Sequence, residues 1–270
     1  MNSDKKELDA KGINRRNFLM AGAAGIAAAG VGMNAAWAQP KAPDPKILWT
    51  NAKKGGKRVA IITDTQLNIG VPLARKMAKA NYNLVIADPL KGLPEELRSL
   101  GAKVIVVPGI EQEAPNHEGR PGAIQKVVDV AMDEFGGYDS VFIRTAWHGG
   151  KPILEETPED MQMSYEQNCL AVMYALQAVM PPLMKAGRGQ VVVQTSATGE
   201  KPQPTSMAYS TMRAAAGMLV RCAAMTVAPN GVCVNAVGTN FMNYPGFREA
   251  AGYWNPHRRA NRAAPEPGGR

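Results

Sequence analysis

Short runs of apolar residues alternate along the chain with longer stretches in which apolar residues recur at helical spacing. The short runs are rich in Val and Ile and end in polar residues or glycine, which is typical of buried strands. The predicted strands cover residues 57–64, 82–89, 102–109, 138–147, 189–197 and 231–240. The predicted helices cover residues 71–80, 122–137, a long segment that follows Pro158 and runs through 165–184, and the segment that carries Tyr209.

This order of elements predicts the fold class. Strands that are apolar throughout and alternate with helices indicate a parallel sheet covered by helices on both faces. The expected fold is therefore α/β, a Rossmann-like doubly wound parallel sheet, formed by residues 57–254. Residues 39–56 are expected to be a linker, and the Pro- and Gly-rich residues 255–270 a flexible tail.

The first 38 residues have a different character. Residues 14–20, NRRNFLM, hold paired arginines followed by Phe-Leu, and a weakly apolar Gly/Ala-rich run comes next. Residues 36–38, Ala-Trp-Ala, offer a cleavage site of small residues. Residues 1–38 thus resemble a twin-arginine export signal, which implies passage through the twin-arginine export machinery and a soluble periplasmic protein after cleavage. The alternative is an N-terminal anchor helix that is never removed.

Composition narrows the function classes. The chain has 270 residues, of which 45% are hydrophobic and 20% charged, as expected for one ordinary globular domain. The formal net charge is +8 at pH 7, but Lys and Arg are scattered and form no dense basic run interleaved with aromatic residues. Because nucleic-acid binding needs basic residues that cluster, we expect no nucleic-acid partner.

Metal and disulfide chemistry is not expected either. The three cysteines, Cys169, Cys222 and Cys233, lie inside apolar stretches without a Cys-x-x-Cys spacing, so buried thiols are predicted. His148 could be a base or a ligand, but no second His, Cys or carboxylate stands near it at a metal-binding spacing. We therefore predict no metal site and interpret His148 as a loop residue.

The candidate chemistry lies in residues 196–217, SATGEKPQPTSMAYSTMRAAAG. Tyr209 precedes Arg213 by four residues, so the two side chains share one face of the predicted helix. Ser196 stands thirteen residues before Tyr209, at the end of the predicted fifth strand. A fixed cation beside a phenol favours the phenolate, which is a base. The alternative is a surface Tyr and Arg on an amphipathic helix.

The order strand, Ser196, Tyr209, Arg213 resembles the short-chain dehydrogenase/reductase superfamily, in which a Ser is followed after about twelve residues by Tyr-x-x-x-Lys. The resemblance spans roughly Arg58 to Met242, and Asn168 falls where the superfamily often keeps a helix asparagine. It implies an enzyme with a small-molecule substrate, in a homo-oligomer. The superfamily's last helix and strand are not evident in the chain, so we expect the sheet to lack them.

The cofactor motif departs from the superfamily. Its dehydrogenases carry Thr-Gly-x-x-x-Gly-x-Gly after the first strand, whereas residues 63–70 read TDTQLNIG. Asp64 and Asn68 replace the first two glycines and only Gly70 is kept, so the Asp64 carboxylate is expected to repel phosphate and fill its space. The superfamily lysine is also replaced, by Arg213. We therefore expect no cofactor, with NAD or NADP as the alternative.

These departures resemble the halohydrin dehalogenases, relatives of the superfamily that have a Ser-Tyr-Arg triad and a halide pocket. The resemblance implies that Tyr209 removes a proton from a vicinal haloalcohol held by Ser196, while Arg213 stabilises the phenolate. The products would be an epoxide and halide. The implied substrate- and halide-binding residues are Thr63, Asn68, Asn240, Phe241 and Met242.

Two further hypotheses stay open. The chain could be an atypical NAD(P)-dependent oxidoreductase of the short-chain dehydrogenase/reductase superfamily. It could also be a non-catalytic periplasmic relative that serves as a binding or accessory subunit.

Overall fold

The computed structural model describes residues 56–66, 69–110, 122–144 and 149–239. All of them belong to one compact unit, Pro43–Arg270. Several sequence predictions fall outside these residues: the export signal 1–38, the linker up to residue 55, the tail, Asn68, His148, Asn240, Phe241 and Met242.

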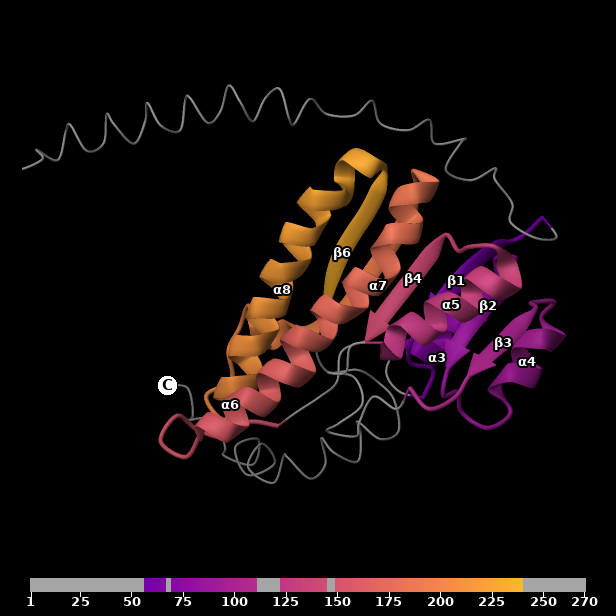
Figure 1. Ribbon diagram of the computed structural model, residues 1–270. Helices are drawn as coiled ribbons and strands as arrows, with labels where there is room; N and C mark the ends of the chain where they lie inside the picture. The colour runs from indigo at the N-terminus through magenta and orange to yellow at the C-terminus, as the bar shows by residue number, and fades with distance from the viewer. Residues whose placement is uncertain (1–55, 67–68, 111–121, 145–148, 240–270) are drawn as a thin grey trace, which may run out of the picture. The chain divides into compact units, whose positions relative to one another are not determined.

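Six strands form one fully parallel sheet (Figure 1). They are β1 Arg58–Ile62, β2 Tyr82–Ala87, β3 Val104–Val107, β4 Ser140–Arg144, β5 Gly189–Ser196 and β6 Val232–Thr239. Their order in the sheet is β3-β2-β1-β4-β5-β6, which confirms the predicted doubly wound α/β fold. The order in which successive strands are added reverses between β1 and β4. In such sheets, ligands bind outside the carboxyl ends of the strands on either side of this reversal.

Helices connect the strands. They are α3 Gly70–Lys79, α4 Leu93–Ser99, α5 Ala123–Phe135, α6 Pro158–Tyr165, α7 Ala171–Ala186 and α8 Met207–Val227. The predicted long helix after Pro158 is present, but a π-helical turn, η1 Glu166–Leu170, separates α6 from α7. The short helix α4 was not predicted from the sequence.

The helices cover the two faces of the sheet separately. Residues of α3 and α4 pack against one face, in a core that contains Ile62, and residues of α5, α7 and α8 pack against the other, in a core that contains Ile61. Adjacent residues of a strand point to opposite faces of the sheet. Because helices cover both faces, Ile61 and Ile62 are both fully buried. Burying such a side chain stabilises the fold by about 1.5–3 kcal/mol. This two-sided burial explains why the strands are apolar throughout.

The register of the strands brings the candidate residues to one edge. Ile62 of β1 pairs with Phe142 of β4, and Ser196 of β5 pairs with Thr239 of β6. Because all strands are parallel, their carboxyl ends lie at the same edge of the sheet. Thr63 and Ser196 are therefore at that edge.

The cysteines differ from the prediction. Cys222 and Cys233 are exposed and Cys169 is partly buried. Cys222 lies on a side of α8 that contributes nothing to the core, and Cys233 lies on β6, at an edge of the described sheet. Their apolar neighbours in sequence pack inward while the thiols point outward, so the prediction of buried thiols is wrong for these two.

Candidate active site

Thr63 fastens β1 to β4. Its backbone N donates to Phe142 O at 3.1 Å, and its Oγ1 accepts from Arg144 N at 3.2 Å. The side chain is only 1% exposed. Among the described residues, Thr63 thus joins the carboxyl ends of the two strands at the point where the sheet reverses.

Asp64 follows Thr63 and forms a buried ion pair. Asp64 Oδ2 lies 3.2 Å from Arg144 Nη1, and the two side chains are 5% and 6% exposed. Asp64 Oδ1 accepts from Gln66 N at 2.8 Å, which closes the turn. The expectation that this carboxylate repels a phosphate is therefore corrected: it is held inside the protein, and the guanidinium of Arg144 offsets its charge.

Gly70 keeps the turn after β1 tight. A Cβ at this position would lie 1.7 Å from Asp64 O, so no other residue fits without moving the backbone. Gly70 is the first residue of α3, whose N-cap Ile69 makes no side-chain capping bond and whose first turn has no acidic residue. Free N–H groups at a helix start favour anions such as phosphate. The start of α3 therefore fits the pyrophosphate of a dinucleotide, although two of the three motif glycines are absent from the sequence.

Asp88 is a candidate residue that the sequence analysis missed. It follows β2 in a left-handed conformation, with φ of 38°. Its two carboxylate oxygens accept from Gly109 N at 2.7 Å and Ile110 N at 2.6 Å, so the side chain is fixed at the carboxyl edge of the sheet. An acidic residue about 20 residues beyond the glycine turn holds the ribose hydroxyls in NAD-binding sheets. That spacing was the available sequence signal.

Ser196 ends β5 and begins a short turn. Its Oγ accepts from Thr198 N at 3.3 Å and from Thr198 Oγ1 at 3.1 Å. The turn, η2 Ala197–Gly199, lies against α8, because a Cβ on Gly199 would be 2.9 Å from the backbone carbon of Arg213. The strand-end serine therefore stands next to the helix that carries Tyr209.

Tyr209 and Arg213 are in direct contact. The guanidinium carbon of Arg213 lies 4.8 Å from the centroid of the Tyr209 ring, as the spacing of four residues predicts. Arg213 is only 6% exposed, whereas Tyr209 is partly exposed. A buried cation over the ring is unlike a surface pair on an amphipathic helix, and it brings a positive charge next to the phenol.

Asn168 lies in the π-helical turn η1, which packs against α8. It is fully buried, and its Nδ2 donates to Ser164 O at 3.0 Å. Asn168 Oδ1 has no hydrogen-bond partner among the residues that the structure describes. Since π-helical turns occur frequently at functional sites, the position of Asn168 fits a role near α8.

The comparisons with known proteins define the class. Residues 58–251 match the family model described as short chain dehydrogenase. The chain belongs to this family.

Several relatives have curated names. The chain is 27% identical to D-beta-hydroxybutyrate dehydrogenase of Rhizobium meliloti over 190 residues, which cover 70% of this chain and 72% of the relative. It is 26% identical to L-2,3-butanediol dehydrogenase of Corynebacterium glutamicum over 183 residues, which cover 66% of this chain and 69% of the relative.

Solved structures share the fold. A xylitol dehydrogenase with bound NAD+ superposes with a TM-score of 0.64 at 23% identity and covers 72% of this chain and 74% of its own. A 7α-hydroxysteroid dehydrogenase in complex with NADH gives a TM-score of 0.63 at 23% identity, with 74% and 76% covered.

These findings overturn two expectations. The prediction of a halohydrin dehalogenase is wrong, because the chain belongs to the short chain dehydrogenases and these relatives are named as dehydrogenases. The prediction that no cofactor is used is contradicted as well, since the chain belongs to the short chain dehydrogenase family and its relatives are named as dehydrogenases. The physical error was to treat the Asp64 carboxylate as an unpaired charge, whereas it is paired with Arg144.

Proposed function

We propose that the protein is a nicotinamide-dependent oxidoreductase that interconverts a hydroxyl group and a carbonyl group on a small molecule. The observation that carries the proposal is the contact of Arg213 with the ring of Tyr209, next to the strand-end Ser196, in a chain of the short chain dehydrogenase family. The relatives support the substrate class, because they are named for a hydroxy acid, a vicinal diol and a sugar alcohol.

Three side chains perform the proton chemistry. Tyr209 accepts the proton of the substrate hydroxyl during oxidation and returns it to the carbonyl oxygen during reduction. Ser196 donates a hydrogen bond to that same oxygen. Arg213 supplies a fixed positive charge next to Tyr209, over the face of its ring at 4.8 Å. NAD(P), when bound, supplies or accepts the hydride.

The cofactor would be held at the carboxyl edge of the sheet. The start of α3 at Gly70 would receive the pyrophosphate, because its N–H groups favour an anion. Asp88 would accept hydrogen bonds from the ribose hydroxyls of the adenosine half. A carboxylate there disfavours the 2′-phosphate of NADP, so NAD is the expected cofactor.

The signal-like residues 1–38 support a periplasmic site of action after export through the twin-arginine machinery. The periplasm has no free nicotinamide pool, so the protein would have to bind its cofactor before export and carry it across the membrane in the folded state. Protein recovered from the periplasm should then contain bound nucleotide, which extraction and chromatography would measure. Nucleotide-free protein that binds none on titration would contradict the proposal.

The main test is a titration followed by turnover assays. The purified protein should bind NADH with saturation in the micromolar range, and it should reduce NAD in the presence of a hydroxy acid, a diol or a sugar alcohol. Tyr209→Phe should lower kcat by about 100-fold or more while nucleotide binding stays unchanged. Tyr174→Phe on α7 is the matched control. Flat titrations up to millimolar nucleotide would end the proposal.

A further inference from the structure

The start of α8 lacks a cap of its own. The helix begins at Met207, its N-cap Ser206 makes no side-chain hydrogen bond to the first turn, and that turn has no acidic residue. The N–H groups of a first turn need acceptors from outside the helix. Tyr209 is the third residue of α8, so the group that fixes these donors also fixes the position of the phenol.

The acceptors come from residues 149–157, the segment that precedes α6. Met207 N donates to Lys151 O at 3.2 Å, and Ala208 N donates to Glu156 Oε2 at 3.1 Å. A carboxylate at the positive end of a helix is attracted by the helix dipole, and a hydrogen bond to a charged acceptor is stronger than a neutral one. Glu156 therefore performs the capping that Ser206 does not.

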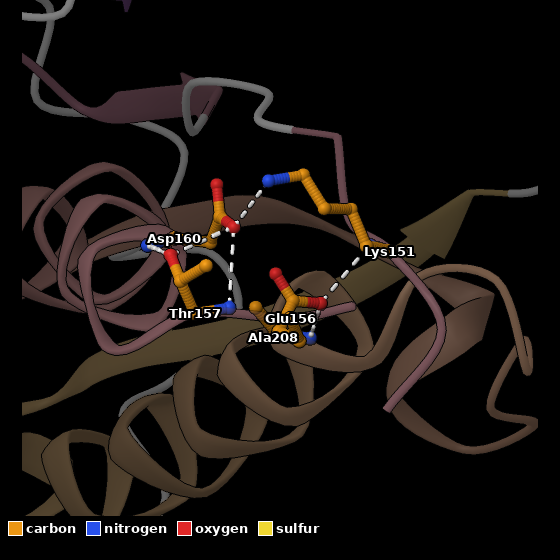
Figure 2. Close-up of polar contacts among 5 residues, drawn as sticks. All are labelled: Lys151, Glu156, Thr157, Asp160 and Ala208. Atoms are coloured by element: carbon orange, nitrogen blue, oxygen red, sulfur yellow. Dashed lines mark hydrogen bonds and ion pairs between the residues drawn. The ribbon is translucent and has the colours of Figure 1, made fainter. Parts of the chain in front are cut away.

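The segment that presents Glu156 is itself well anchored (Figure 2). Glu156 Oε2 also accepts from Lys151 N at 3.0 Å, and Lys151 Nζ lies 2.6 Å from Asp160 Oδ2. Asp160 and Thr157 form the capping box of α6. The hydrogen bond from Lys151 lowers the pKa of Asp160 most, and the hydrogen bond from Thr157 lowers it further, so this carboxylate stays charged. Glu156, the acceptor for the α8 amide, thus directly precedes the anchored start of α6 and does not lie in a free loop.

A second contact supports the same arrangement. A Cβ on Gly150 would lie 2.7 Å from the Cα of Ser206, so the segment approaches the start of α8 as closely as a glycine allows.

The second carboxylate oxygen of Glu156, Oε1, is buried without a hydrogen-bond partner among the described residues. A buried polar atom without a hydrogen-bond partner destabilises the fold. The carboxylate is therefore a poor choice for stability alone.

We propose that Glu156 is a positioning residue for Tyr209: its carboxylate holds the first turn of α8 against residues 149–157. The catalytic meaning of this contact rests on the proposed function. The contact itself does not, and it can be measured without any substrate.

The experiment compares Glu156→Ala and Glu156→Gln with Glu155→Ala, which removes the neighbouring exposed carboxylate. Hydrogen exchange is followed by mass spectrometry over residues 206–210, and kcat and KM are measured on the same full-length preparations. Glu156→Ala should accelerate exchange of the amides of residues 207–209 by about tenfold and lower kcat by about tenfold, with KM for NAD unchanged. Glu156→Gln keeps one acceptor oxygen and should restore part of both losses.

The outcomes separate this proposal from the proposed function. Unchanged exchange in both Glu156 variants, or equal acceleration in Glu155→Ala, would overturn the positioning role. Accelerated exchange with unchanged kcat would overturn it too. If the wild-type protein shows no nucleotide-dependent turnover, the proposed function fails, and the exchange data alone decide whether Glu156 holds the helix start. If Glu156→Ala does not fold, Glu156→Gln gives the same comparison.

Discussion

Asp64 Oδ2 and Arg144 Nη1 lie 3.2 Å apart, in side chains that are 5% and 6% exposed. The pair joins the turn after β1 to the end of β4, at the place where the strand order reverses. In the superfamily motif a glycine would stand at position 64. The chain has thus replaced a small residue by a charge and has placed the opposite charge beside it.

Removing one partner of this pair should be far worse than removing both. Arg144→Met leaves a buried carboxylate without its cation, and such changes cost about 3–5 kcal/mol. Asp64→Asn together with Arg144→Met should recover most of that loss, because no charge stays buried. Urea unfolding of the two single variants and the double variant measures the coupling.

The exposed pair of Arg75 and Glu96 is the control for that cycle. Arg75 Nε lies 2.7 Å from Glu96 Oε1, but the two side chains are 47% and 42% exposed. Arg75→Met should change stability only slightly, because water screens and replaces the interaction. Additive losses for Asp64 and Arg144 would show that the buried pair is not coupled.

Arg213→Lys should retain part of the activity, whereas Arg213→Met should lose nearly all of it. The lysine keeps a cation on the helix face next to Tyr209, as in the superfamily pattern, while methionine keeps only the volume. We expect kcat to fall by about 10-fold for lysine and about 1000-fold for methionine. Steady-state kinetics at fixed NAD measures the difference. Equal kcat for both variants would remove the cation from the mechanism.

Asp88→Ser should change the cofactor preference. Loss of the carboxylate removes the acceptor for the ribose hydroxyls and the repulsion of a 2′-phosphate, so Kd for NAD should rise by about tenfold and Kd for NADP should fall. Fluorescence titrations with NADH and NADPH measure both constants. Asp88 also accepts from Gly109 N and Ile110 N. Asp88→Asn removes the charge but keeps an acceptor oxygen for one of these two donors, so it should loosen the loop less than Asp88→Ser and helps to separate a charge effect from loop loosening.

Alkaline pH should destabilise the fold through Tyr138. This side chain is 1% exposed, its Oη donates to Val179 O at 2.7 Å, and burial raises its pKa. The unfolded chain loses this proton from about pH 10 upward while the folded chain keeps it. The contribution of Tyr138 to the free energy of unfolding should therefore be fully present below pH 10 and fall above it by about 1.4 kcal/mol per pH unit.

Tyr138→Phe tests this assignment. The variant loses a buried hydrogen bond and should be less stable at pH 7 by about 0.5–1.5 kcal/mol. Its stability should nevertheless depend less on pH above 10, as urea unfolding at several pH values would show. Parallel profiles for the variant and the wild type would assign the alkaline loss to other groups.

Most of the sheet was predictable from the sequence. A strand such as β2 is fully buried along all of its residues, so its apolar run is unambiguous. The helix α4, Leu93–Ser99, was missed because seven residues with a Pro at the start form no clear amphipathic period. The spacing of Tyr209 and Arg213 predicted their contact, since both lie on one helix.

The cofactor prediction failed for a different reason. The sequence shows that Asp64 is a carboxylate, but its partner Arg144 is 80 residues away, and only the packing of β1 beside β4 brings them together. The role of Glu156 was invisible for the same reason, because its acceptor function depends on the approach of residues 149–157 to α8. Local patterns predict elements well, whereas partners across the fold need the register.

The crowding at Gly70 affects how proteins of this kind can be recognised. A methyl group there would meet Asp64 O at 1.7 Å, while position 64 tolerates a whole side chain. Mutation can therefore erase the front of the glycine motif in a lineage while its last glycine stays invariant. A motif search that demands all three glycines would discard such lineages. A search for one glycine after the first strand and an acid after the second would retain them.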